Sequence, residues 1–148
     1  MFDPGQQVTS FNGQEFVYGL KGAHAFIAND YELSVVLKRT RWPFERLIRE
    51  VPLVITTKGS RGSVINSGRQ RMVIPPAKPK NISDPTGAGD AYRAGFVKGL
   101  QLGWPPEKSG RLGSVVSVYS VETYGTQTHY FTWPDIQARY FANFKKRI

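Results

Sequence analysis

The chain has 148 residues, of which 40% are hydrophobic and 21% charged, and it contains no cysteine. This composition supports a folded core and excludes wholesale disorder, a disulfide framework and a cysteine-type metal site. The net charge of +9 suits an anionic partner, such as a phosphorylated small molecule or a nucleic acid. Because the sequence has neither a membrane-length apolar run nor a signal-peptide pattern, we expect a soluble cytoplasmic protein without a membrane partner.

The first half of the sequence predicts alternating helices and strands. Apolar residues recur at helical spacing after Asp30 and Pro43, and proline is well tolerated in the first helical turn. A continuous apolar run before residue 58 is typical of a parallel strand that is covered on both faces. We expect helices over residues 13–21, from 30 and from 43, and strands over 23–28 and 52–57.

The second half of the sequence continues the alternation. A proline-rich stretch over 75–80 predicts an extended connector, and the pattern beyond it is mainly helical. Together the two halves indicate an α/β fold with a mainly parallel sheet in one domain. We expect strands over 63–66, 71–74 and 129–132, and helices from the turn at 84–90 to about 102, from 105 and over 134–144.

The strongest chemical signal is the turn Thr86-Gly87-Ala88-Gly89-Asp90, which leads straight into a helix. We expect Thr86 to cap this helix, which leaves the amides of residues 87–89 unpaired at the positive end of the helix dipole. Such a helix start binds anions, and Asp90 beside it can accept a proton from an attacking hydroxyl. Taken alone, the pattern also fits a helix start with glycines for close packing.

Two better-known phosphate motifs do not match this turn. A P-loop ends in Gly-Lys-Ser/Thr, and no lysine follows these glycines. A dinucleotide-binding turn needs a third glycine where Tyr92 stands. The turn is therefore a phosphate-site candidate of another type.

The segment from Asp84 to Ala91, followed by Ala94-Gly95-Phe96, closely resembles the C-terminal signature of the ribokinase (PfkB-type) carbohydrate kinases. Other similarities follow in the same chain order. They are Phe2-Asp3-Pro4-Gly5-Gln6-Gln7, similar to a loop of the adenosine-kinase-like branch, Asn29-Asp30-Tyr31-Glu32, Thr57-Lys58-Gly59 with Gly62, and the loop Val121 to Gln127. The resemblance implies a ribokinase-like three-layer sandwich, of which residues 1–148 form the C-terminal half. The sugar-binding and lid portion of the family would lie outside this sequence.

The resemblance also implies a role for each matching residue. Asp90 would be the general base, and Gly87, Ala88 and Gly89 would form the anion hole for the γ-phosphate of ATP. Asn29 and Glu32 would orient waters on Mg²⁺, although a first-turn glutamate is also typical of an exposed helix start. The nucleotide would contact Thr57, Gly59, Gly62 and Ser114. Of these, Ser114 stands where many ribokinases have an asparagine. A monovalent cation such as K⁺ would lie near Asp84 and Gly125.

These observations predict an ATP-dependent phosphotransferase that acts on a hydroxyl of a sugar or nucleoside, adenosine-like or ribose-like. The alternative is a non-catalytic, truncated nucleotide-binding remnant or interaction module. A basic nucleic-acid-binding module is the weakest interpretation, because the positive charges are spread along the chain. We expect little activity from this chain by itself, and association with a second copy or with a complementary N-terminal segment.

Overall fold

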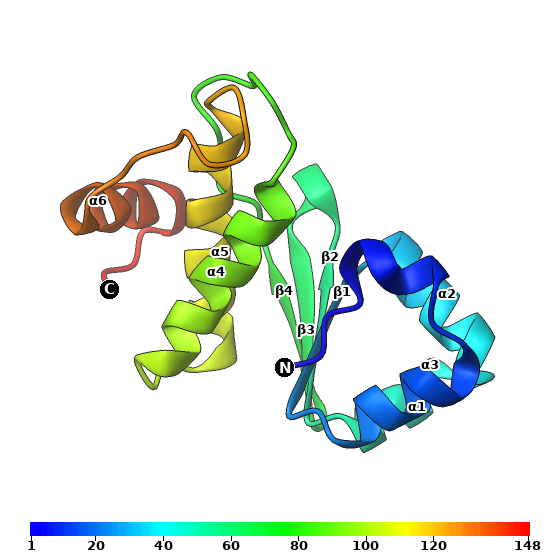
Figure 1. Ribbon diagram of the computed structural model, residues 1–148. Coiled ribbons are helices and arrows are strands. Elements are labelled where there is room, and N and C mark those ends of the chain that lie inside the picture. The colour runs from blue at the N-terminus through cyan, green and yellow to red at the C-terminus, as the bar shows by residue number, and fades with distance from the viewer. The chain divides into compact units, whose positions relative to one another are not determined.

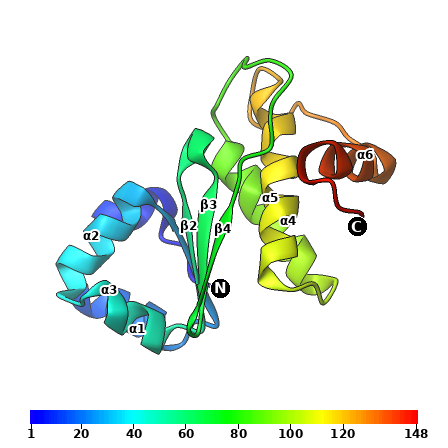
Figure 2. The ribbon, with the colours of Figure 1, turned by 180° about the vertical axis from the view of Figure 1, so that it is seen from behind.

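The computed structural model describes all 148 residues, which form two compact units (Figure 1, Figure 2). Unit 1 comprises Met1–Gly59 and Ser63–Val73, and unit 2 comprises Ser60–Gly62 and Ile74–Ile148. In neither unit does a helix combine the length and the apolar character that crossing a bilayer requires.

Unit 1 is built on a four-stranded sheet in the order β1-β2-β3-β4, with strands β1 (Ala25–Asn29), β2 (Leu53–Thr57), β3 (Ser63–Ser67) and β4 (Gln70–Ile74). Strands β1 and β2 are parallel, whereas β2 and β3 are antiparallel. The expected mainly parallel sheet is therefore wrong, and the sheet is mixed. The connection from β2 to β3 is too short for the crossover that a parallel pair needs, so the chain turns back on itself.

Helices α1 (Gly13–Lys21), α2 (Asp30–Thr40) and α3 (Phe44–Glu50) lie on one side of this sheet (Figure 1). They begin close to the positions that the apolar spacing predicts. The apolar side chains on the helix faces that point toward the sheet pack against it and form a core from which water is excluded. The fully buried members of this core include Phe16, Leu20, Phe26, Val36, Leu47 and Val54.

Unit 2 contains three helices, α4 (Ala88–Gln101), α5 (Pro106–Val121) and α6 (Trp133–Phe144). Helices α4 and α5 approach closely because Gly95 and Gly113 face each other, and a Cβ on Gly95 would lie 2.9 Å from the Cα of Gly113. The strand expected over 129–132 is wrong, since this stretch is irregular. Within this stretch, Phe131 packs on an aromatic residue of α5 instead, with its ring centroid 4.9 Å from that of Tyr119.

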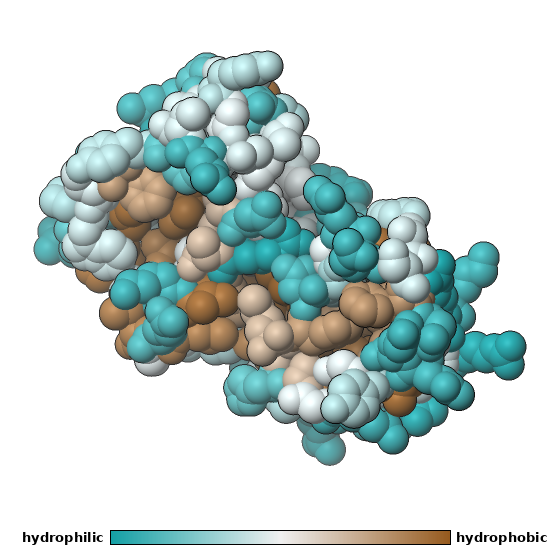
Figure 3. Space-filling view, viewed as in Figure 1, coloured by the Kyte–Doolittle hydropathy of each residue, from teal (hydrophilic) through white to brown (hydrophobic).

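Unit 2 also carries apolar surface. A hollow of about 270 Å³ is lined almost entirely by apolar atoms, including those of Gly95, Val116 and Phe131. Trp133 and Phe141 on α6 are each exposed by more than two fifths. Figure 3 shows hydrophobic surface over the helices of this unit, on the left of the view. Exposed apolar patches of this kind are typical of surfaces that associate with other molecules.

Candidate active site

The start of α4 is the feature around which the candidate site is built. Gly87 is the N-cap residue, with the left-handed φ of 83°, and no side chain caps the helix. The expected cap by Thr86 is therefore wrong, because the chain enters α4 through a left-handed residue that glycine adopts without strain. The amide of Ala88 donates to Pro85 O at 3.2 Å, whereas those of Gly87 and Gly89 meet no acceptor in the chain. Two backbone donors are thus available at the positive end of the helix.

The turn before α4 is held by Asp84. Its Oδ1 accepts from the Thr86 amide at 2.9 Å and its Oδ2 from the Gly125 amide at 3.2 Å. Hydrogen bonds from the side chain and backbone of Thr86, and then from the Gly125 amide, lower the pKa of Asp84. The structure thus brings together Asp84 and Gly125, the two residues expected near a monovalent cation.

The loop after α5 packs directly on the glycine turn. A Cβ on Gly87 would lie 3.1 Å from the Cβ of Thr126 and 3.3 Å from the Oγ of Ser120. The Ser120 hydroxyl also donates to Thr86 O at 3.3 Å. A side chain at position 87 would therefore both strain the backbone and push this loop away.

Asp90 occupies the first turn of α4 with its side chain 86% exposed. Its Oδ1 accepts a hydrogen bond from Arg93 Nη1 at 3.0 Å. The carboxylate is thus accessible to an incoming group and lies within one helical turn of the available amides. A general base needs this combination of exposure and proximity to the reacting centre.

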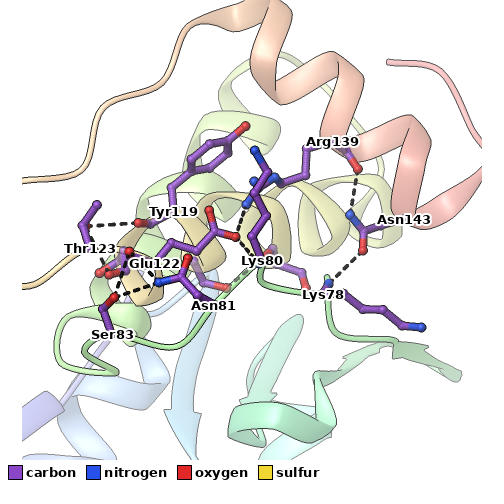
Figure 4. Close-up of polar contacts among 12 residues, drawn as sticks. Lys78, Lys80, Asn81, Ser83, Tyr119, Glu122, Thr123, Arg139 and Asn143 are labelled. Carbon is purple, nitrogen blue, oxygen red and sulfur yellow. Dashed lines mark hydrogen bonds and ion pairs between the residues drawn. The ribbon is translucent and has the colours of Figure 1, made fainter.

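A buried ion pair anchors the segment that leads into this turn (Figure 4). Glu122 Oε1 accepts from Arg139 Nη1 at 2.7 Å and from the Lys80 amide at 2.5 Å. The Glu122 carbonyl accepts from Asn81 Nδ2 and Ser83 Oγ, both at 3.2 Å. Sequence reasoning missed this cluster, because no spacing pattern links residues from a connector, the end of α5 and the middle of α6.

Asn29 and Glu32, the residues expected near Mg²⁺, form a capping box at the start of α2. The Glu32 amide donates to Asn29 Oδ1 and the Asn29 amide to Glu32 Oε2, each at 2.8 Å. Glu32 is buried, so the alternative of an exposed first-turn carboxylate is wrong. Carboxylate and amide oxygens are hard ligands that suit Mg²⁺ or its waters, although the box already uses the single side-chain oxygen of Asn29 and one carboxylate oxygen of Glu32.

The residues expected to contact the nucleotide fall in three places. Thr57 ends β2 opposite Asn29, in the parallel register of the two strands. Gly59 and Gly62 both have left-handed φ values, and a Cβ on Gly62 would lie only 2.1 Å from Ile74 O. Ser114 is buried on α5, and its hydroxyl accepts from the Ala77 amide at 2.7 Å. A nucleotide contact by Ser114 stays a prediction, because this hydroxyl already holds the connector.

Residues 10–133 match the pfkB family of carbohydrate kinases. The chain belongs to this family. It is 33% identical over 138 residues to the nucleoside kinase of Methanocaldococcus jannaschii, covering 93% of this chain and 46% of that protein. This pfkB-family chain thus spans about half the length of the curated relatives that it matches.

Solved structures agree with this family assignment. The nucleoside kinase of Burkholderia thailandensis in complex with inosine is 32% identical with a TM-score of 0.97, covering 99% of this chain and 49% of that one. The same kinase as an ADP-inosine complex gives a TM-score of 0.96, covering 99% and 46%. Ribokinase from Thermotoga maritima matches with a TM-score of 0.78 over 93% of this chain and 47% of that one. Because its sequence identity is only 24%, this match shows the fold alone. The chain therefore has part of a ribokinase-like α/β fold.

Proposed function

We propose that this chain supplies the phosphate site and the general base of an ATP-dependent kinase that phosphorylates a nucleoside hydroxyl. The observation that carries the proposal is the uncapped start of α4, where the amides of Gly87 and Gly89 lie within one turn of the exposed Asp90 carboxylate. The acceptor class is supported by relatives named nucleoside kinases, one of them solved with inosine and with ADP-inosine. Adenosine-like and ribose-like acceptors are the compounds to test.

The chemistry that we assign to these groups is a single phosphoryl transfer. Asp90 takes the proton of the acceptor hydroxyl as its oxygen forms a bond to the γ-phosphorus, while the bond from that phosphorus to the ADP oxygen breaks. The amides of Gly87 and Gly89 and the positive end of α4 stabilise the charge on the transferring group.

Two cations would support the step. Bound Mg²⁺ would supply positive charge to the phosphates of ATP, and we assign Asn29 and Glu32 to orienting its waters. A monovalent cation such as K⁺ would lie near Asp84 and Gly125, which the hydrogen bond from the Gly125 amide to Asp84 Oδ2 brings together. Thr57, Gly59, Gly62 and Ser114 are the residues that we propose to contact the nucleotide.

We place the chain, residues 1–148, as the C-terminal half of one ribokinase-like domain with a three-layer α/β sandwich, acting in the cytoplasm. The sheet of unit 1 would then gain strands from the rest of that domain. By itself the chain is expected to turn over slowly, because an acceptor that no sugar site holds loses a proximity effect of up to roughly 7–11 kcal/mol. Self-association, or association with a complementary N-terminal segment, would cover the open sheet edge.

The second candidate function is a nucleotide-binding remnant without catalysis. Binding at the uncapped start of α4 does not itself need a base, because the backbone amides and the helix dipole supply the attraction. The remnant would bind nucleotide at the same helix start and would phosphorylate nothing. A nucleic-acid-binding role would instead show strongly salt-dependent binding to DNA or RNA and no preference for ATP.

Calorimetry on this chain with Mg²⁺-ATP and with adenosine tests the proposal. We expect tighter binding of ATP than of adenosine, and loss of that preference in the variant Gly89→Val. Equal binding of the two ligands would contradict the phosphate site. Assays of ADP formation with inosine, adenosine and ribose, in the presence and absence of an N-terminal segment, separate the kinase from the remnant.

A further inference from the structure

Arg93 lies one helical turn after Asp90 on α4 and contacts it directly. Its Nη1 donates to Asp90 Oδ1 at 3.0 Å, in the i,i+3 arrangement that neighbouring turns of a helix allow. The two ends of this pair differ in exposure, since the Arg93 side chain is 20% exposed and that of Asp90 is 86% exposed. In an ordinary surface ion pair both side chains are exposed, whereas here the Arg93 side chain is largely buried and the Asp90 carboxylate is exposed.

The Arg93 guanidinium also lies over the glycine turn. A Cβ placed on Gly89 would be 3.0 Å from Arg93 Nη1 and 3.9 Å from its Cζ. The positive charge is therefore next to the backbone whose amides form the proposed phosphate site. Gly89 thus leaves room for a ligand at its amide and for this guanidinium as well.

The proposed reaction creates an electrostatic conflict at this helix start. A general base in its active form is negatively charged, and the triphosphate that must lie beside it is strongly negative as well. Like charges a few ångströms apart repel unless a positive group lies close to both. Bound Mg²⁺ would offset part of the charge of the triphosphate, and the dipole of α4 contributes about half a positive charge, which is less than the carboxylate alone carries.

We propose that Arg93 is a positioning residue that pairs with Asp90 and offsets its charge, so that base and triphosphate can occupy the same helix start. The inference rests on the proposed function, because it needs a phosphate group at residues 87–89. It assigns Arg93 no contact with the acceptor. The pair holds Oδ1 of Asp90, and Oδ2 is the oxygen that we assign to the acceptor hydroxyl.

A charge cycle measured by calorimetry tests this role on the intact chain. Arg93→Gln keeps length and a donor but removes the charge, and we expect Mg²⁺-ATP to bind about tenfold more weakly, the factor equivalent to 1.4 kcal/mol. Adenosine binding should not change. Arg93→Lys keeps the charge and should bind ATP within about threefold of the original chain.

The decisive variant is the double substitution Arg93→Gln with Asp90→Asn. Because the carboxylate that repels ATP is then also gone, we expect ATP affinity to return to within about threefold of the original. A packing role for Arg93 would predict no such recovery. Lys98→Ala is the matched control, because it removes an exposed positive charge from the last turn of the same helix.

The outcomes separate this inference from the proposal on which it rests. If the original chain shows no preference for ATP over adenosine, the phosphate site is wrong and the inference falls with it. If that preference is present and Arg93→Gln binds ATP as tightly as Lys98→Ala, only the role of Arg93 is wrong. An unrecovered double variant, with helix content intact by circular dichroism, would likewise reduce Arg93 to a packing residue.

Discussion

Helices α2 and α4 begin in opposite ways. At α2, Asn29 and Glu32 satisfy each other's backbone amides with two hydrogen bonds of 2.8 Å. At α4, Gly87 offers no side chain, and the amides of Gly87 and Gly89 have no acceptor in the chain. A self-capped helix start gains stability locally, whereas an uncapped one keeps its donors for a ligand.

The uncapped start is held by contacts from elsewhere in unit 2. Asp84 accepts hydrogen bonds from the amide of Thr86 in the turn and from that of Gly125 in the loop after α5, and Thr126 of the same loop packs on Gly87. The Glu122–Arg139 pair in turn fixes the segment before Asp84. The α4 turn therefore depends on long-range contacts, and the α2 turn on its own first four residues.

The largest expected effect concerns the first-turn carboxylate of α4. Asp90→Asn keeps the shape of the side chain but removes its basicity, so turnover should fall about 10²–10⁴-fold in a kinase assembled from this chain and an N-terminal segment. The melting temperature should hardly change, because the side chain is exposed. Near-normal turnover would exclude Asp90 as the base.

The next effect concerns the anchor of the uncapped start. Arg139→Ala leaves Glu122 buried without its partner, and we expect a loss of about 3–5 kcal/mol in the free energy of unfolding. Arg46→Ala is the matched control, because Arg46 also pairs with a glutamate and lies over an aromatic ring, with its side chain 45% exposed. That variant should cost no more than about 1 kcal/mol. Equal losses in urea denaturation would show that the buried pair does not anchor unit 2.

Gly87→Ala tests whether the turn itself is needed. The left-handed conformation costs an alanine about 1–2 kcal/mol, and its Cβ would press on Thr126. Gly68→Ala introduces the same strain at φ 56° with nothing within 4 Å, so it serves as the control. We expect similar strain in both variants but weaker ATP binding in Gly87→Ala alone. Unchanged ATP affinity in calorimetry would contradict the phosphate site.

Local sequence patterns predicted much of this architecture. The helix over 13–21 is confirmed at both ends, and the apolar run before residue 58 is a strand as expected. The family resemblance carried by residues 84–96 is confirmed by the match of residues 10–133. These features depend on neighbouring residues, whose spacing and capping are visible in the sequence.

Features that depend on distant contacts were not predicted. The glycine cap of α4 and the Glu122–Arg139 pair both rest on where other segments lie. The antiparallel pairing of β2 with β3 has a local cause instead, the short connection between the two strands. The segment 129–132 has the composition of a strand but no neighbouring strand to pair with, and Phe131 packs on a helix instead. The proposed roles of the site residues stay predictions, because each role is defined by contact with a ligand.

A smaller effect is expected at the self-capped helix. Asn29→Ala removes the acceptor for the Glu32 amide, and we expect a loss of about 1 kcal/mol in the free energy of unfolding. Asn29→Gly, which gives α2 the residue type that begins α4, should cost only a few tenths of a kcal/mol. The comparison of the two helix starts would be wrong if both variants unfolded at the same urea concentration as the original chain.

The smallest effect is the pH response of the turn before α4. Hydrogen bonds lower the pKa of Asp84 in the folded chain, so its contribution to stability is complete above the ordinary aspartate pKa and is lost as the pH falls through the lowered value. Between pH 7 and pH 5 we expect no change. The amide signals of Thr86 and Gly125 in NMR spectra should therefore shift only in more acidic solution, and Asp84→Asn should abolish that response. If these amide signals instead shifted at a pH equal to or above the ordinary aspartate pKa, the carboxylate would not be holding this turn.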